Sequence, residues 1–282
     1  MRARRLPGPL AGVVIAVAVA AVTSCSAGSQ EPAASSSSGA DALVAAADPT
    51  LLPYNFLDDD GKTWKGLNVD LAAALSAKLG REVVFQSAGF DTIIPGLTSG
   101  RFDLALTGMF DTKERQKTVD FVDYLAAKND FLTRVGYADI ASMDDLCGVK
   151  VGIPSGALEA DLLAEASTKC KTAGKPAVDV KEFADLDATV LALMSSRIDV
   201  APNDSAANAY ILSRNEGKVK TSGAYLNEGY FAAAFPKSSE LTSQFETAFK
   251  EVIADGGYAK ILADWGIPDR GLQAPIVNGS PF

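Results

Sequence analysis

Hydrophobic and polar residues alternate in short blocks along the chain, and the blocks follow two different periodicities. Leucine occupies every fourth position from Leu67 to Leu79 and Gly80 follows, which predicts an amphipathic helix that ends at a glycine. Short apolar runs such as Ala42 to Ala47 and Phe102 to Thr107 predict buried strands. Strands that alternate with helices in this way are typical of an α/β fold.

The alternation runs through the chain in two units. In the first unit we expect helices at Asp91 to Ser99 and from Asp111 to about Val119. The second begins with a strand at Lys150 to Pro154 and a helix at Leu158 to Thr168. The other expected strands are Val83 to Gln86, Val178 to Phe183, Ile198 to Ala201 and Tyr230 to Phe235, and the other expected helices are Asp185 to Ser195, Ala206 to Ser213, Leu241 to Ile253 and Tyr258 to Trp265. Two such units predict two α/β lobes.

Residues 1–24 have the pattern of a signal peptide and are set aside from the fold. Three arginines precede an apolar stretch from Leu10 to Val22, which is too short to cross a bilayer as a helix. The order Val22-Thr23-Ser24-Cys25 resembles the lipobox of bacterial lipoproteins, in which the cysteine becomes lipidated. The alternative is a signal cleaved elsewhere, with an incidental cysteine. Residues 25–40 lack aromatic and β-branched side chains and predict a flexible tether.

Composition limits the chemistry. Among 282 residues, 26 are Lys or Arg and 35 are Asp or Glu, and the net charge of −9 argues against a nucleic-acid-binding face. The chain has no histidine, which excludes a Ser-His-Asp or Cys-His catalytic pair and an HExxH zinc site. Most hydrolase mechanisms are therefore excluded. We expect no catalytic residue, no metal and no cofactor.

Three cysteines are an odd number for an exported chain. If Cys25 carries a lipid, Cys147 and Cys170 remain as a pair in an oxidising compartment, and we expect them to form a disulfide. Two unpaired, buried cysteines are the alternative.

Three strand-to-helix junctions carry the candidate binding groups. Ligands of α/β sheets lie beyond the carboxyl ends of strands, where helix N-termini present N–H groups. Arg115 follows the first junction and can meet a carboxylate through two parallel hydrogen bonds, although by itself it could be a solvated helix residue. Gly152 to Ala157 forms the second, without a basic residue. At the third, Asp204 could receive an ammonium group or simply cap the next helix.

Six stretches in order, from about residue 46 to 268, resemble the polar amino-acid-binding family of solute-binding proteins that serve ABC importers. These stretches are Asp48-Pro49-Thr50, Gly66 to Leu71, Phe90 to Asp103, Gly108 to Arg115, Val119-Asp120-Phe121, and Ala254 to Ile261 with Trp265. The resemblance implies a type II periplasmic-binding-protein fold of two lobes, each a mixed sheet flanked by helices. The surroundings of Cys147 and Cys170 look like an actinobacterial branch in which the two are bridged.

The same resemblance implies the division of the chain. Residues 41–133 and 236–270 are expected to form lobe 1, residues 134–235 lobe 2 with its hinge strands, and residues 271–282 a C-terminal tail. The chain would cross between lobes near Phe131 to Tyr137 and return near Gly229 to Phe235.

By similarity, Arg115 holds the α-carboxylate of the ligand, Asp204 holds its α-ammonium, and Thr107 and Gly108 add backbone contacts. The expected pocket wall consists of Asp48, Leu51, Phe90, Phe110, Pro154, Ala157, Leu158 and Asn203. Phe90 could instead be a core aromatic and Asp48 a turn residue. Phe110, Leu51 and Ala157-Leu158 replace residues that are usually more polar or aromatic, so the side chain of the ligand stays open.

The resemblance implies an extracytoplasmic, lipid-anchored monomer that captures an amino acid or an analogue by domain closure and passes it to an ABC permease in the membrane. It would bind no nucleic acid and would not be an enzyme. One alternative is a dehydratase on this scaffold, similar to the cyclohexadienyl dehydratases, which without histidine would rely on Asp48 or Asp204. Another is a sensory lipoprotein that reports its ligand to a separate receptor.

Overall fold

The computed structural model describes residues 42–223 and 228–282, so the predicted signal peptide, Cys25 and the tether lie outside the described residues. The first lobe contains a sheet whose strands are β1 (Leu43–Ala47), β4 (Val83–Ser87), β5 (Leu104–Phe110), β11 (Glu228–Pro236) and the first part of β6 (Val119–Arg134). Its order is β4-β1-β5-β11-β6. The first three strands are parallel, and β11 pairs antiparallel with both β5 and β6. This is a mixed sheet.

Helices cover both faces of this sheet. They are α1 (Leu67–Leu79), α2 (Phe90–Thr98), α6 (Glu240–Ala254) and α7 (Gly257–Asp264). Leu104 and Leu106 of β5 pack into the cluster that contains residues of α1, α6 and α7. Ala105 and Met109 of the same strand pack with α2. This alternation follows from the two-residue period of a strand and fixes β5 at the centre of the lobe.

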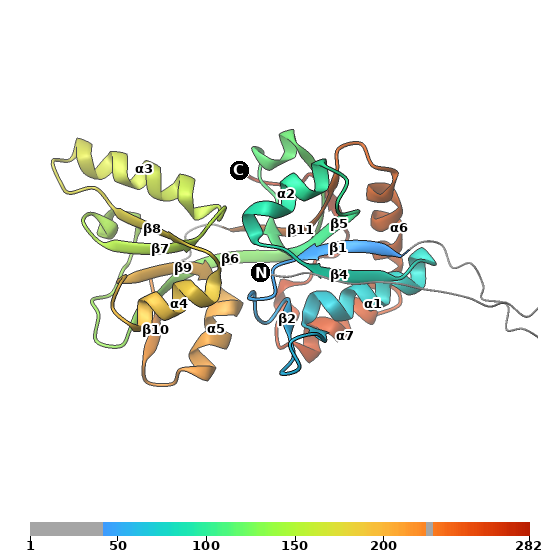
Figure 1. Ribbon diagram of the computed structural model, residues 1–282, viewed down its shortest axis with the longest axis horizontal. Coiled ribbons are helices and arrows are strands. Elements are labelled where there is room, and N and C mark those ends of the chain that lie inside the picture. The colour runs from blue at the N-terminus through green and yellow to red at the C-terminus, as the bar shows by residue number, and fades with distance from the viewer. Residues whose placement is uncertain (1–41, 224–227) are drawn as a thin grey trace, which may run out of the picture. The chain divides into compact units, whose positions relative to one another are not determined.

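The strand β6 passes from the first lobe into the second, as Figure 1 shows. Up to Lys128 it pairs with β11, and from Asn129 it pairs with β9 (Val200–Asp204) in the second sheet. The change of sheet therefore falls between Lys128 and Asn129, a few residues before the crossing expected near Phe131. One continuous strand connects the two lobes, because its backbone hydrogen bonds are satisfied on both sides of the crossing.

The second lobe repeats the layered arrangement. Its sheet has the order β6-β9-β7-β8, with β10 paired to β6. The further strands are β7 (Lys150–Pro154), β8 (Asp179–Phe183) and β10 (Val219–Ser222), and the helices are α3 (Glu159–Thr172), α4 (Leu186–Met194) and α5 (Ser205–Arg214). One apolar cluster joins the sheet to α3 and another joins it to α4 and α5. None of the helices in the described residues has the length and hydropathy needed to cross a membrane.

The remaining elements are short. They are the strands β2 (Phe56–Leu57), β3 (Trp64–Lys65) and β12 (Ile276–Val277), and the 3₁₀ helices η1 (Arg115–Lys117), η2 (Met143–Leu146) and η3 (Pro268–Arg270). Two segments differ from the structure that the sequence predicted for them. The helix expected from Asp111 is only a turn followed by η1, and the segment expected to be a tail forms β12, which pairs with β6 at Val122 and Asp123.

The structure joins Cys147 and Cys170 by a disulfide across 23 residues of sequence. Cys170 lies on α3 and is buried in the apolar cluster of the second lobe, and Cys147 packs against the same cluster. The bridge ties the residue that follows Leu146 to the last turn of α3, just before β7 begins at Lys150.

Removing this bridge in a Cys147→Ala/Cys170→Ala double variant should lower the free energy of unfolding by about 3 kcal/mol, because the unfolded chain regains the entropy of an open loop of this length. Urea unfolding with and without a reducing agent measures it. The reducing agent should destabilise the wild type and leave the double variant unchanged. Equal stability of oxidised wild type and double variant would contradict the prediction.

Candidate ligand-binding site

A cavity of about 70 Å³ lies between the two lobes. Its lining residues are Asp48, Thr50, Leu51, Phe90, Gly108, Phe110, Arg115, Asn129, Pro154, Ala157, Leu158, Glu159, Leu186, Pro202, Asn203, Asp204 and Phe231. Every residue that the sequence assigned to the binding site lines this cavity except Thr107. The cavity thus brings together side chains that are far apart in the sequence.

Arg115 reaches the cavity from η1, on the first lobe. Its Nη1 donates to the carbonyl of Phe110 at 2.8 Å, and its Nη2 donates to the carbonyl of Gly156, on the second lobe, at 3.0 Å. The guanidinium also lies 5.5 Å from the centre of the Phe90 ring, a cation–π contact. Burial lowers the pKa of Arg115, and the charges of Glu159, Asp161 and Asp111 oppose this effect. Arg115 is therefore a cation between the lobes that protein carbonyls hold in place.

Asp204 stands at the end of β9 and caps α5. Its Oδ1 accepts hydrogen bonds from the backbone N–H groups of Ala206 and Ala207, at 2.9 and 3.2 Å. The capping role left open by the sequence is therefore real, and it places the carboxylate at the cavity wall as well. Only 3% of Asp204 is exposed to solvent, so its charge has to be compensated by neighbouring groups.

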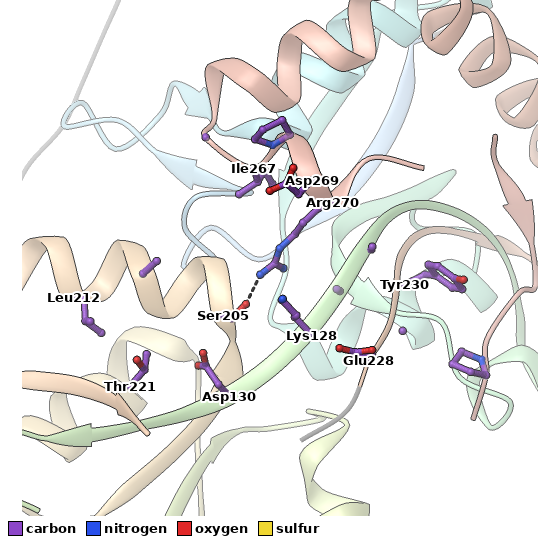
Figure 2. A pocket seen from close by; sticks show the side chains of 17 residues that line it. Lys128, Asp130, Ser205, Leu212, Thr221, Glu228, Tyr230, Ile267, Asp269 and Arg270 are labelled. Carbon is purple, nitrogen blue, oxygen red and sulfur yellow. Dashed lines mark hydrogen bonds between the residues drawn. The ribbon is translucent and has the colours of Figure 1, made fainter. Parts of the chain in front are cut away.

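That compensation comes from the first lobe. The hydroxyl of Tyr54 donates to Oδ1 of Asp204 at 2.7 Å, and Nη1 of Arg270 lies 2.8 Å from its Oδ2. Nη2 of Arg270 also donates to the hydroxyl of Ser205. Figure 2 shows Arg270 extending from η3 to Ser205. Both residues line a second groove, of about 760 Å³. The carboxylate is thus tied to two side chains of the opposite lobe.

Asp48 forms the wall at the end of β1 and is 6% exposed. Its Oδ1 accepts from the backbone and the hydroxyl of Thr50, at 2.9 and 2.7 Å. Burial raises the pKa of Asp48, and these two hydrogen bonds lower it. Thr107 lies behind Asp48 rather than in the cavity wall, where its hydroxyl accepts the backbone N–H of Asp48 at 2.9 Å. Thr107 is therefore placed to orient Asp48.

Gly108 and Phe110 shape the floor of the cavity. Gly108 has a φ of +66°, and a Cβ there would lie 2.7 Å from the side chain of Leu51, so both the backbone and the space require glycine. The Phe110 ring packs edge-on against Phe231, with centroids 4.8 Å apart. Apolar side chains therefore cover this part of the site.

Sequence reasoning missed Glu159, Asn129, Tyr54 and Arg270. Glu159 resembles an ordinary acid in the first turn of a helix, yet it is buried in the cavity wall and accepts a hydrogen bond from the side-chain amide of Asn129. Burial raises its pKa to about 7, against the opposing charge of Arg115. The one local signal was its place directly after the Gly156 turn. For Tyr54 and Arg270 no local signal exists, because their partner is Asp204 on the other lobe.

Known proteins resemble this chain in sequence and in fold. The model of a family described as bacterial extracellular solute-binding proteins, family 3, matches residues 43–268. The chain belongs to this family. An arginine-binding protein, ArgT, of Corynebacterium glutamicum is 30% identical over 241 residues, which cover 85% of this chain and 79% of that protein. ArtP, an arginine-binding extracellular protein of Bacillus subtilis, is 33% identical, covering 82% of this chain and 88% of that protein.

A solved structure shares the fold. It is an ancestral arginine-binding protein bound to arginine, with a TM-score of 0.73 and 34% identity, which covers 80% of this chain and 98% of that chain. All three of these proteins are binding proteins. This supports the interpretation of the present chain as a binding protein over the dehydratase alternative.

Replacing Glu159 by glutamine should make stability depend less on pH. Because the folded-state pKa is raised from 4.5 to about 7, the folded protein keeps a proton that the unfolded chain releases in this range. The carboxyl therefore makes stability fall as pH rises from about 4.5 to about 7. Urea unfolding across that range should show a shallower decline for Glu159→Gln than for the wild type. Glu165→Gln, an exposed acid of α3, is the control; an unchanged slope in Glu159→Gln would contradict the burial argument.

Proposed function

We propose that this solute-binding protein captures an amino acid between its lobes and delivers it to an ABC permease. The observation that carries the proposal is that Arg115 from one lobe and Asp204 from the other line the same cavity. A guanidinium and a carboxylate are complementary to the two charged ends of an amino acid. The proposal is supported by the relatives named above, which are arginine-binding proteins.

Capture requires the lobes to separate and close again. The cavity of about 70 Å³ is well below the roughly 300–1,000 Å³ of ordinary small-molecule sites. Contacts of Arg115 with Gly156 and of Asp204 with Tyr54 and Arg270 hold the lobes together. A ligand carboxylate would replace the Gly156 carbonyl as the partner of Arg115. Because the ligand would then contact both lobes, it would favour the closed arrangement.

The acidic wall favours a ligand with a cationic side chain. Asp48, Glu159 and Asp204 face the cavity and Arg115 is its one basic lining residue among the described residues. A buried carboxylate has to be paired with a cation or neutralised by a proton. A ligand that brings a second positive charge would meet this requirement at Asp48 or Glu159, while Leu51 and Phe110 cover the aliphatic part of its side chain. L-arginine is therefore the first candidate, and the protein acts as a receptor without catalysis.

Isothermal titration calorimetry with L-arginine, L-glutamine and L-glutamate tests this function. L-arginine should bind the wild type most tightly, and Arg115→Ala should weaken binding by about 100-fold or more, because a buried carboxylate would be left unpaired. Lys117→Ala is the matched control, since Lys117 belongs to the same 3₁₀ helix but its side chain is 70% exposed. Equal affinities of Arg115→Ala and wild type would contradict the proposed role.

We also propose that the protein is a monomer held at the outer face of the cell membrane by a lipid on Cys25. The order Val22-Thr23-Ser24-Cys25 supports lipidation, and the family is one of extracellular proteins. A Cys25→Ala variant should appear in the culture medium, whereas the wild type should sediment with the membranes, because a lipid anchor adds membrane affinity with each buried methylene. Immunoblotting of the two fractions measures this, and release of both proteins in equal amounts would contradict it.

A further inference from the structure

The segment Asn278 to Phe282 lies outside the region that matches the family, and it packs against the turn that carries Arg115. The family match ends at residue 268. The carbonyl of Phe282 accepts the backbone N–H of Lys113 at 2.8 Å. The ring of Phe282 lies 6.3 Å from that of Phe110, centroid to centroid. This segment therefore contacts both the backbone of the turn and the ring of Phe110.

Two more contacts hold the segment in place. The backbone N–H of Phe121, on β6, donates to the side-chain carbonyl of Asn278 at 2.9 Å. The backbone N–H of Ser280 donates to Oδ2 of Asp111 at 2.9 Å. Both Asp111 and Ser280 are buried, so these hydrogen bonds are shielded from water and costly to break.

Asp111 connects the segment to the turn. Besides Ser280, it accepts hydrogen bonds from the side-chain amide of Gln116, at 2.8 Å to Oδ1 and 3.0 Å to Oδ2. Gln116 directly follows Arg115, and the backbone N–H of Arg115 donates to the hydroxyl of Thr112 at 3.2 Å. The carboxylate of Asp111 thus links the two ends of the turn, because Asp111 precedes Arg115 and its partner Gln116 follows it.

Asp123 is buried beside Asp111 and has an unusual environment. Neither of its carboxyl oxygens has a hydrogen-bond donor as partner among the described residues. A Cβ at Gly279 would lie 2.6 Å from its Oδ2, so the segment approaches it closely enough to require glycine there. Two carboxylates are both acceptors, and a hydrogen bond between Asp123 and Asp111 requires a proton on one of them.

Burial raises the pKa of Asp123 to about 8, and the neighbouring carboxylate of Asp111 adds to this shift. The polar backbone of Gly279, which is close to Asp123 but outside hydrogen-bond geometry, and the positive charge of Lys113 lower this pKa to a smaller extent. This raised pKa favours the protonated form of Asp123 at neutral pH, which can donate a hydrogen bond to Asp111.

We propose that Asp111, braced by the segment Asn278 to Phe282 and by Asp123, is a positioning residue that fixes the turn carrying Arg115 and thereby sets the affinity for the ligand. The proposal rests on the proposed function only for its affinity readout. It follows that the site is coupled to pH through a group outside the cavity. When Asp123 loses its proton, two buried like charges repel each other, and the turn loses its support.

The test compares wild type with Asp123→Asn, whose amide can donate to Asp111 at every pH. Calorimetry with L-arginine should show wild-type affinity falling about five-fold or more between pH 7 and pH 9. Asp123→Asn should bind like the wild type at pH 7 and keep that affinity within about two-fold. Titration of the ligand ammonium affects both proteins equally, so the difference between them isolates Asp123. Parallel profiles of the two proteins would overturn the proposal.

Amide hydrogen exchange provides a readout that needs no ligand. Protection factors of residues 110–117 should fall at pH 9 in the wild type and persist in Asp123→Asn. Asp144→Asn, an exposed acid of η2 in the second lobe, is the control and should behave like the wild type. If no amino acid binds the wild type but exchange follows this pattern, the proposed function fails while the positioning role stands. Unchanged protection in both proteins would refute the positioning role itself.

Discussion

Two opposite charges on facing lobes, the half-buried Arg115 and the buried Asp204, are the constraint on which the rest of the structure depends. A buried charge is costly unless it is paired or hydrogen-bonded. Both charges are compensated across the lobe boundary. The carbonyl of Gly156 accepts a hydrogen bond from Arg115, and Asp204 is bound by Tyr54 and Arg270. Each charge is therefore a point where one lobe holds the other, and a ligand that carries both charges can take over that role.

The fold places these charges by simple means. The strand β6 belongs to both sheets, so the lobes share a backbone element and not only a surface. Arg115 follows the end of β5, and Asp204 ends β9 and caps α5. Both groups therefore stand where strands end and backbone N–H groups are available, which is where α/β proteins place their ligands.

Local patterns in the sequence predicted most of the regular elements. The leucine repeat and Gly80 gave α1, and Asp185 caps α4 through the N–H of Ala188, as an acid before an apolar helical run suggests. The helix expected at Asp111 was wrong, because Asp111 accepts from Gln116 and from the distant Ser280 instead of capping a helix. Most of β6 was missed, since its polar residues, Asp120, Asp123 and Lys128 among them, interrupt the apolar pattern of a buried strand.

The residues of the candidate site also fall into two groups, those that the sequence predicted and those that it did not. Residues of the strand-to-helix junctions were found from local motifs and family resemblance. Glu159 had only its place after the Gly156 turn as a local signal, and Tyr54 and Arg270 become visible only when the lobes are brought together. The role of all these site residues in binding stays a prediction. The most direct measurement is a crystal structure of the protein with bound L-arginine. We expect the α-carboxylate within hydrogen-bond distance of the Arg115 guanidinium and the α-ammonium against Asp204. A ligand bound elsewhere, with Arg115 still on the Gly156 carbonyl, would contradict it.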